Sequence, residues 1–214
     1  DGDFSAIVFK TTADPFVGKL SYFKVLNGTL SSDTPVWNVS KETNEKIAQP
    51  FTIRGKDQEP IDRVVAGDIG AVSKLNTVLT NDYLATENNP ITLPPIRFPQ
   101  PIYQMAVSPK SRADVDKMTS SLSRIGEEDP TLKIEREQST GETLLNGLGD
   151  THLEVSIERM KRKFGVEMTL SLPKVPYQET ITANSKAEYR HKKQSGGHGQ
   201  FGHVWLELEP KDSG

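Results

Sequence analysis

Apolar residues recur every three or four positions in two stretches of the chain, and this spacing predicts two amphipathic helices. The apolar stripe of the first stretch consists of Val115, Met118, Leu122 and Ile125. That of the second consists of Leu153, Ile157, Met160 and Phe164. Thr151 and Glu154 have the spacing of a capping box at the start of the second helix, and Gly126 and Gly165 are the expected stops.

Shorter apolar runs between and around these helices predict four strands. Two runs, 132–134 and 143–145, are joined by a polar connection at residues 139–141 that contains Gly and suits a hairpin loop. Further runs occupy residues 102–107, before the first helix, and 166–172, after the second. The order is therefore βαββαβ, the ferredoxin-like arrangement with two helices on one face of a four-stranded antiparallel sheet.

The first eighty or so residues show short apolar runs without a convincing helix among them. These runs occupy residues 4–9, 20–26, 36–39, 51–54, 61–65 and 69–72. Turn-forming pairs separate them, namely Asp14 with Pro15, Asn27 with Gly28, Ser32 with Asp33, and Gly67 with Asp68. We expect this region to be a small all-β barrel.

Prolines divide the chain. Five of them fall between residues 90 and 101, where neither a helix nor a ladder can continue, and Pro173 and Pro176 mark a second boundary. We expect a β-barrel at 1–89, a linker at 90–100, a ferredoxin-like domain at 101–173, and the start of another domain at 174–214. The last piece has two predicted strands, 180–190 and 200–209, and because two strands bury too little core, we expect the chain to be a fragment. The fold class is thus multidomain, all-β followed by α+β.

Composition limits the classes of function. With 34% hydrophobic residues, 26% charged residues and a net charge of −3, the chain has the make-up of an ordinary globular protein, so any basic surface must be local. It contains no Cys and no apolar run near the roughly 20 residues that span a bilayer. We expect a cytoplasmic protein with no membrane partner and no disulfide.

A nucleotide site would need the GxxxxGK[ST] loop, in which backbone amides hold phosphates and a hydroxyl binds magnesium. The Gly-Lys pairs at Gly18 and Gly55 are followed by Leu20 and Asp57, so neither supplies that hydroxyl. The sequence predicts that this fragment has no cofactor and is not an enzyme by itself.

The other polar clusters are explained without a metal site or a catalytic site. His191, His198 and His203 lack the spacing of a zinc finger, so we expect solvent-facing or RNA-facing side chains rather than metal ligands. His152 and Glu154 are two residues apart, on different helical faces, which disfavours a catalytic pair. The acidic run at residues 127–129 is expected to be a solvated loop after the first helix.

Positive charge gathers in two places. Arg159 and residues 161–163 end the second predicted helix, where cations complement the helix dipole, although RNA contact is an equal alternative. Further on, Lys186, Arg190, Lys192 and Lys193 stand against the single acid Glu188 and lead into a glycine-rich loop. Because cations and amide donors on a flexible loop suit a phosphate backbone, we predict RNA contact there. The candidate residues are Arg190, Lys192, Lys193, Gln194, Ser195, Gly196, Gly197, His198, Gly199 and Gln200.

Residues 192–203 strongly resemble the opening of the fourth domain of elongation factor G. The resemblance extends backwards, since residues 127–130, 147–154 and 159–162 are similar to the third-domain signature, and residues 14–18 and 66–69 to the second, barrel domain. It implies a translational GTPase that drives tRNA–mRNA translocation, with GTP and Mg²⁺ bound by a GTPase domain absent from this fragment. The implied partners are the ribosome, through ribosomal RNA, small-subunit proteins and tRNA–mRNA, and that missing domain of the same protein.

Two departures from the family pattern leave alternatives open. The family usually carries Arg where His198 stands, and Glu then Leu where Asp150 and Thr151 stand. A diverged paralogue that acts in ribosome recycling or ribosome protection is therefore one alternative. A stand-alone enzyme or a plain RNA-binding module is another, and the enzyme would require a pocket with converging titratable groups.

Overall fold

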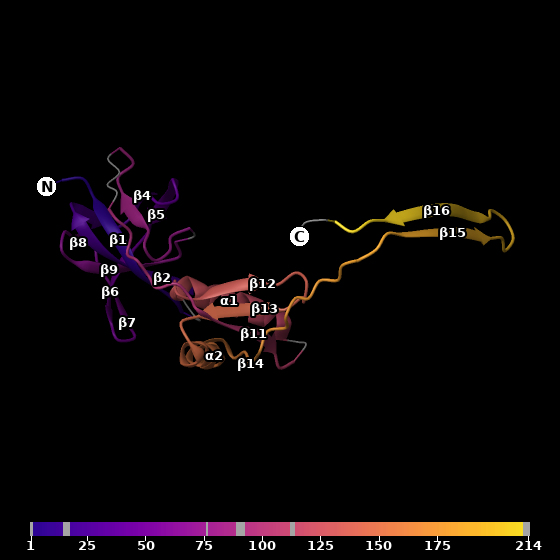
Figure 1. Cartoon of the computed structure of the whole chain (residues 1–214). Helices are drawn as coiled ribbons and strands as arrows, with labels where there is room; N and C mark the ends of the chain where they lie inside the picture. The colour runs from indigo at the N-terminus through magenta and orange to yellow at the C-terminus, as the bar shows by residue number, and fades with distance from the viewer. Residues whose placement is uncertain (1, 15–17, 76, 89–92, 112–113, 212–214) are drawn as a thin grey trace. The chain divides into compact units, whose positions relative to one another are not determined.

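The computed structural model describes residues 2–14, 18–75, 77–88, 93–111 and 114–211 (Figure 1). Pro15 of the predicted first turn and residues 90–92 of the predicted linker lie outside these ranges. The chain divides into two compact units, 1–174 and 175–214. Within the described residues, neither helix has the length and apolar character needed to cross a bilayer.

An antiparallel sheet of eight strands begins the first unit. In spatial order its strands are β5 (Thr43–Ile47), β4 (Thr34–Asn38), β10 (Tyr83–Ala85), β1 (Ser5–Asp14), β2 (Gly18–Asn27), β9 (Ile69–Ser73), β6 (Pro50–Arg54) and β7 (Asp57–Pro60). A two-stranded ribbon of β3 (Thr29–Ser31) and β8 (Arg63–Val65) accompanies it. Register shifts between β1 and β2 mark bulges, which bend a sheet. The sheet curves around a core that includes Val8, Phe23 and Leu30 and, with β5 and β7 as its edges, forms a half-barrel.

The predicted all-β fold of this region is confirmed, but the sequence pattern missed several strands. It missed β5 and β7, the two edges of the sheet, whose sequences are mostly polar. An edge strand has one ladder partner and more contact with water, so it need not alternate apolar and polar residues. It also missed the three-residue strands β3 and β10. The predicted strand at 61–65 is shorter in the structure, where β8 covers Arg63–Val65.

The second half of this unit is the predicted βαββαβ fold. Its elements are β11 (Tyr103–Pro109), α1 (Val115–Glu128), β12 (Lys133–Arg136), β13 (Thr143–Gly147), α2 (Asp150–Phe164) and β14 (Met168–Ser171). The sheet order β12-β13-β11-β14 is that of the ferredoxin-like arrangement. Residues of both predicted helical stripes, such as Leu122 and Leu153, share one core with Val107 and Leu145 of the sheet.

Two of the predicted helix ends are wrong and one is confirmed. Gly126 does not stop α1, which continues to Glu128. A Cβ at Gly126 would lie 2.9 Å from Ile134 Cδ1, so a larger residue there would displace the end of that side chain. Thr151 does not cap α2, because the helix already begins at Asp150. Gly165 does end α2, with a φ of 67° in the left-handed region that favours glycine.

A buried carboxylate joins the half-barrel to the βαββαβ fold. Glu128, at the end of α1, has a side chain only 5% exposed, and its Oε1 accepts the backbone N–H of Ala13 at 2.5 Å. Lys163 of α2 donates to the same carboxylate and to the Ala13 carbonyl oxygen, 3.3 Å away. Glu127 forms an ion pair with Lys19 of β2 at 3.7 Å. The expectation that this acidic run is a solvated loop is therefore wrong.

The described part of the proline-rich segment is hydrogen-bonded along its length. Asn81 donates its side-chain amide to the Ile96 carbonyl oxygen and accepts the Ile96 N–H, at 3.0 and 2.8 Å. Tyr83 donates its hydroxyl to the Pro94 carbonyl oxygen, and Lys133 of β12 donates to Gln100. Side chains on both halves of the unit thus hold an extended segment that has few backbone donors of its own.

We expect Glu128→Gln to lower the free energy of unfolding by about 1–3 kcal/mol, because Lys163 would keep a charge without its counter-ion. This is less than the loss for a fully buried pair, since the Lys163 side chain is 31% exposed. Glu127→Gln, the matched control, should change stability by less than about 1 kcal/mol, since its ion pair is longer and its carboxylate is more exposed. Urea denaturation measures both. Equal effects of the two substitutions would contradict the role given to Glu128.

A second prediction concerns acid stability. Hydrogen bonds from Lys110 and Lys161 lower the pKa of Glu167 to about 2, below its value in an unfolded chain. Its stabilising contribution is therefore present above the ordinary carboxyl pKa of 4.5 and is lost as the pH falls towards 2. Glu167→Gln should reduce the loss of unfolding free energy as the pH falls from 4.5 to about 2. Urea unfolding at a series of pH values measures this loss. A profile identical to the parent's, or the same reduction in the control Glu179→Gln, would refute this.

Candidate nucleic-acid interface

The second unit contains a long antiparallel hairpin (Figure 1). Strand β15 (Ser185–Lys193) pairs with β16 (Gln200–Leu208) without a register shift, from Ser185 opposite Leu208 to Lys193 opposite Gln200. The predicted strand at 180–190 therefore begins later and continues further than expected. As a result, Lys192 and Lys193 lie within the ladder rather than in the loop.

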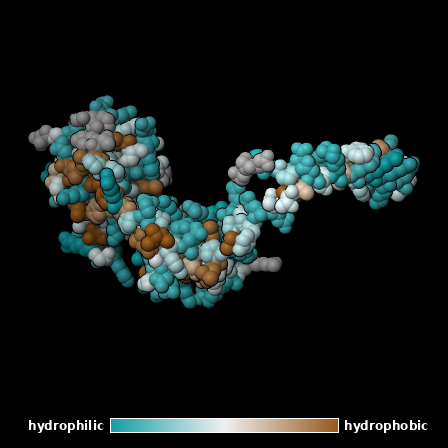
Figure 2. Space-filling model, in the orientation of Figure 1, coloured by the Kyte–Doolittle hydropathy of each residue, from teal (hydrophilic) through white to brown (hydrophobic). Residues whose placement is uncertain are grey.

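Residues 194–199 form the tip of this hairpin. Gly196 and Gly197 have φ angles of 74° and 77°, in the left-handed region, and a Cβ on either would meet nothing within 4 Å among the described residues. The backbone conformation, rather than crowding, thus requires glycine at these two positions. Residues 192–200 are all exposed, and Figure 2 shows hydrophilic side chains over this end of the hairpin.

The structure brings most of the predicted RNA-contact residues together but divides their charges between two faces. Side chains alternate along a strand and paired residues share a face, so the register assigns each residue to a side. Arg190 and Lys192 lie on one face, whereas Lys193 and Gln200 lie on the other. The sequence pattern treated these charges as a single cluster.

The two faces differ in chemistry. One, here called the apolar face, carries Ala187, Tyr189, Val204, Leu206 and Leu208, with His191 and Lys193 towards the tip. The other, here called the mixed face, carries Lys186, Glu188, Arg190 and Lys192 from β15 and Phe201, His203, Trp205 and Glu207 from β16. The aromatic residues of the mixed face were absent from the sequence-based candidates, although alternation along residues 201–205 could have indicated them.

Contacts across the strands organise the mixed face. Lys186 pairs with Glu207 at 2.7 Å, and His203 Nε2 hydrogen-bonds to Glu188 at 2.6 Å. The Arg190 guanidinium lies 5.4 Å from the centre of the Phe201 ring. Both carboxylates are thus engaged by cationic or imidazole partners, and the charge that remains at the tip end is positive.

The three histidines of this unit show no arrangement for a metal. His191 hydrogen-bonds to Gln200 at 3.2 Å on the apolar-face side, while His203 bonds to Glu188 on the mixed face. Within the described ranges, no three His, Cys, Asp or Glu side chains are grouped so that they could hold a metal ion.

His152 has a structural partner instead of a catalytic one. The Leu148 N–H donates to its Nδ1 at 3.0 Å, so we assign the ring proton to Nε2, which donates to Asp129 Oδ2 at 3.0 Å. Burial would raise the pKa of Asp129, but hydrogen bonds from the Thr131 hydroxyl and amide and from His152 outweigh it and lower that pKa. Glu154 lies exposed and is not part of this group.

The face of the four-stranded sheet opposite the helices is a poor surface for nucleobases, and Ala106 and Leu144 on it are buried. In β11–β14, all within the described residues, the side chains on that face are not aromatic: Gln104, Ala106, Ser108, Lys133, Glu135, Leu144, Asn146, Thr169 and Ser171. Sheets of this topology that bind RNA stack bases on exposed aromatic rings. This comparison favours the hairpin as the nucleic-acid surface.

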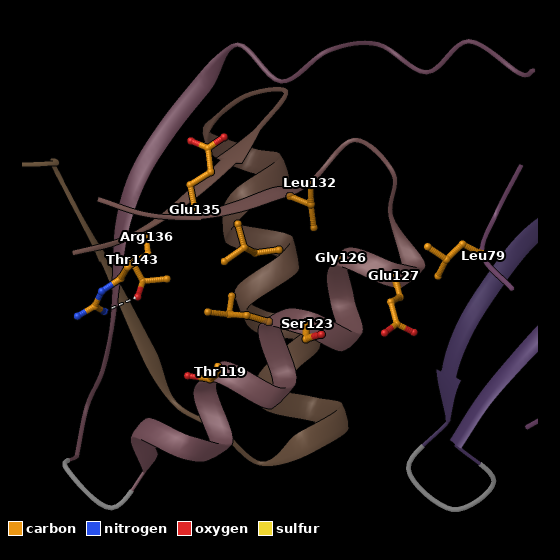
Figure 3. A pocket seen from close by; sticks show the side chains of 11 residues that line it. Leu79, Thr119, Ser123, Gly126, Glu127, Leu132, Glu135, Arg136 and Thr143 are labelled. Atoms are coloured by element: carbon orange, nitrogen blue, oxygen red, sulfur yellow. Dashed lines mark hydrogen bonds between the residues drawn. The ribbon is translucent and has the colours of Figure 1, made fainter. Parts of the chain in front are cut away.

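A cavity of about 580 Å³ lies beside α1 and β12 (Figure 3). Its walls include Leu79, Leu122, Leu132 and Ile134. Figure 3 shows Glu127 and Glu135 at opposite ends, and Arg136 donates to Thr143 at 3.1 Å. Among the described residues that line this cavity, the titratable groups do not converge on one point, so it does not support the stand-alone enzyme.

Comparisons with known proteins cover nearly the whole chain. Residues 3–87 match the family described as elongation factor G domain 2, residues 98–172 match elongation factor G domain III, and residues 173–214 match elongation factor G domain IV. A crystal structure of a protein from Thermus thermophilus is similar, with 36% sequence identity and a TM-score of 0.80. That match covers 99% of this chain and 32% of the other, so this chain spans about a third of its relative.

Proposed function

Because this chain belongs to the elongation factor G family and carries its second and third domains with the start of the fourth, we propose that it is the ribosome-binding part of a translational GTPase. The whole protein would drive tRNA–mRNA translocation in protein synthesis. The observation that carries the proposal is the order of three family matches along the chain, over parts whose folds agree with them.

The hairpin tip supplies the chemistry for RNA contact. Arg190, Lys192 and Lys193 surround an exposed loop in which Gly196 and Gly197 leave the backbone uncovered. Cations bind phosphate oxygens and release counter-ions, and backbone N–H groups can donate to the same oxygens. In this proposal the tip contacts ribosomal RNA or tRNA–mRNA, small-subunit proteins bind elsewhere on the chain, and the protein acts in the cytoplasm.

GTP and Mg²⁺, which the family implies, do not fit the residues present here. A phosphate loop connects a strand to the N-terminus of a helix. Gly18 and Lys19 instead begin β2, and Gly55 and Lys56 form the turn between β6 and β7. We assign nucleotide binding to a GTPase domain of the same protein, outside this chain.

A second candidate function rests on His198, which stands at the exposed tip where the family usually has Arg. Imidazole is a weaker phosphate ligand than guanidinium, because imidazole is charged only when protonated whereas guanidinium is always charged. This difference favours a diverged paralogue that acts in ribosome recycling or ribosome protection.

The tip can be tested by charge removal. Replacing Lys192 and Lys193 together with Ala should weaken binding to isolated small ribosomal subunits and reduce the slope of log K against log salt by roughly two. The matched control replaces Lys174 and Lys211 with Ala, which removes the same charge from exposed positions outside the hairpin. Unchanged affinity and slope in the tip variant would show that this loop is only a structural hairpin.

The assignment of the nucleotide site can be tested separately. Isothermal titration of the 214-residue protein with GTP and Mg²⁺ should give no measurable heat of binding, because the chain lacks the phosphate loop and the magnesium-ligating hydroxyl. A family member that carries the GTPase domain serves as the positive control. Micromolar affinity in the 214-residue protein would overturn the proposal and favour the stand-alone enzyme.

A further inference from the structure

The mixed face of the hairpin displays aromatic rings on alternate residues of one strand. Phe201, His203 and Trp205 all lie on this side of β16, and Phe201 and Trp205 are 66% and 70% exposed. From the rise of a strand, Phe201 and Trp205 are about 13 Å apart along β16, with His203 midway between them. Three rings at regular intervals thus face solvent in a row.

Packing within the hairpin does not account for this exposure. Trp205 stands opposite Glu188, and its ring meets His203 in a tilted contact with centroids 5.8 Å apart. A large aromatic residue that stabilised the ribbon by burial would lose much more of its surface to neighbours. Val204, Leu206 and Leu208 of the apolar face are 52%, 61% and 53% exposed as well, so exposure alone does not mark a binding site; the combination of rings with cations on the mixed face does.

Cations accompany the rings. The register places Lys192 directly opposite Phe201 and Arg190 directly opposite His203, and the Arg190 guanidinium also lies over the Phe201 ring. Rings beside cations are the combination with which proteins bind single-stranded nucleic acid, where bases stack on the rings and phosphates lie against the cations. On the apolar face, Tyr189 lies among aliphatic neighbours, and the ring of His191 lies closer to the tip.

We propose that the mixed face is a stacking platform for single-stranded RNA. Bases lie on Phe201 and Trp205, and the phosphates between them lie against Lys192 and Arg190. This inference rests on the proposed function, which places RNA at the tip, and extends the contact from the tip along β16 by a different physical interaction. The phosphate contacts of the tip do not distinguish single-stranded from double-stranded RNA, whereas stacking requires accessible bases.

The chemistry selects unpaired RNA. In a duplex the base faces are already stacked on one another and cannot reach a ring on the protein surface, so Phe201 and Trp205 would gain nothing from it. At the far end of the platform, Glu188 is engaged by His203 and Glu207 by Lys186, which limits their repulsion of phosphates. The positive end next to the tip fixes where a strand enters the platform.

Tryptophan fluorescence tests the platform directly. The chain has two Trp residues, so Trp37→Phe leaves Trp205 as the only one. Titration with an unstructured uridine-rich oligonucleotide should quench Trp205, because a stacked base lies against the indole. Inorganic polyphosphate carries the same charge without bases, so it should compete for the protein without quenching. RNA binding without quenching would overturn the proposal.

Substitutions provide the second measurement. Phe201→Leu and Trp205→Leu should each weaken oligonucleotide binding between about 5-fold and 150-fold, the range found for single base-stacking aromatics. Tyr189→Leu is the matched control, since Tyr189 is 68% exposed on the apolar face of the same ribbon, and it should leave affinity unchanged. Equal losses in all three variants would show a general effect on the hairpin and also refute the platform.

The outcomes separate this inference from the proposed function. If Trp205→Leu keeps full affinity while the double substitution of Lys192 and Lys193 still lowers the salt slope, the tip contacts RNA and the platform does not exist. If neither change affects binding, RNA contact by this hairpin fails altogether, and the proposed function fails with it.

Discussion

A partly buried ion pair joins the two halves of the first unit. Glu128 is almost fully buried, and a carboxylate in that position is tolerated only when cations and N–H donors replace its water. Lys163 and the Ala13 amide are those replacements, and they come from α2 and β1. The three groups meet only when both helices and the half-barrel are in place. The pair therefore stabilises this packing of the helices against the half-barrel over other compact arrangements.

The second unit depends on a different constraint, the two-residue period of a strand. In an unbroken ladder that period assigns every side chain of β15 and β16 to one of two faces, and both remain exposed on a two-stranded ribbon. Neighbours in sequence such as Lys192 and Lys193 therefore serve opposite surfaces. Distant residues such as Arg190 and Phe201 come into contact. The geometry of the ladder, rather than local charge, determines which groups a partner meets together.

These constraints separate the roles of the two units. In the first, charged side chains such as Glu128 and Lys163 join elements, and the sheet face opposite the helices offers no rings for stacking among its described strands. In the second, cations and aromatic rings remain exposed beside the tip.

The sequence alone determined the helices, the βαββαβ order and the cationic tip, because apolar period, glycine placement and local charge act over a few residues. Only the tertiary structure decided the rest. Gly126 lies inside α1 next to Ile134 of β12, and the Glu128 side chain is buried because β1 and α2 pack against it. The aromatic row of Phe201 and Trp205 follows from alternation within β16, but the cations Arg190 and Lys192 come to lie beside it only through strand pairing. Such features depend on contacts between segments distant in sequence, which a local pattern cannot encode.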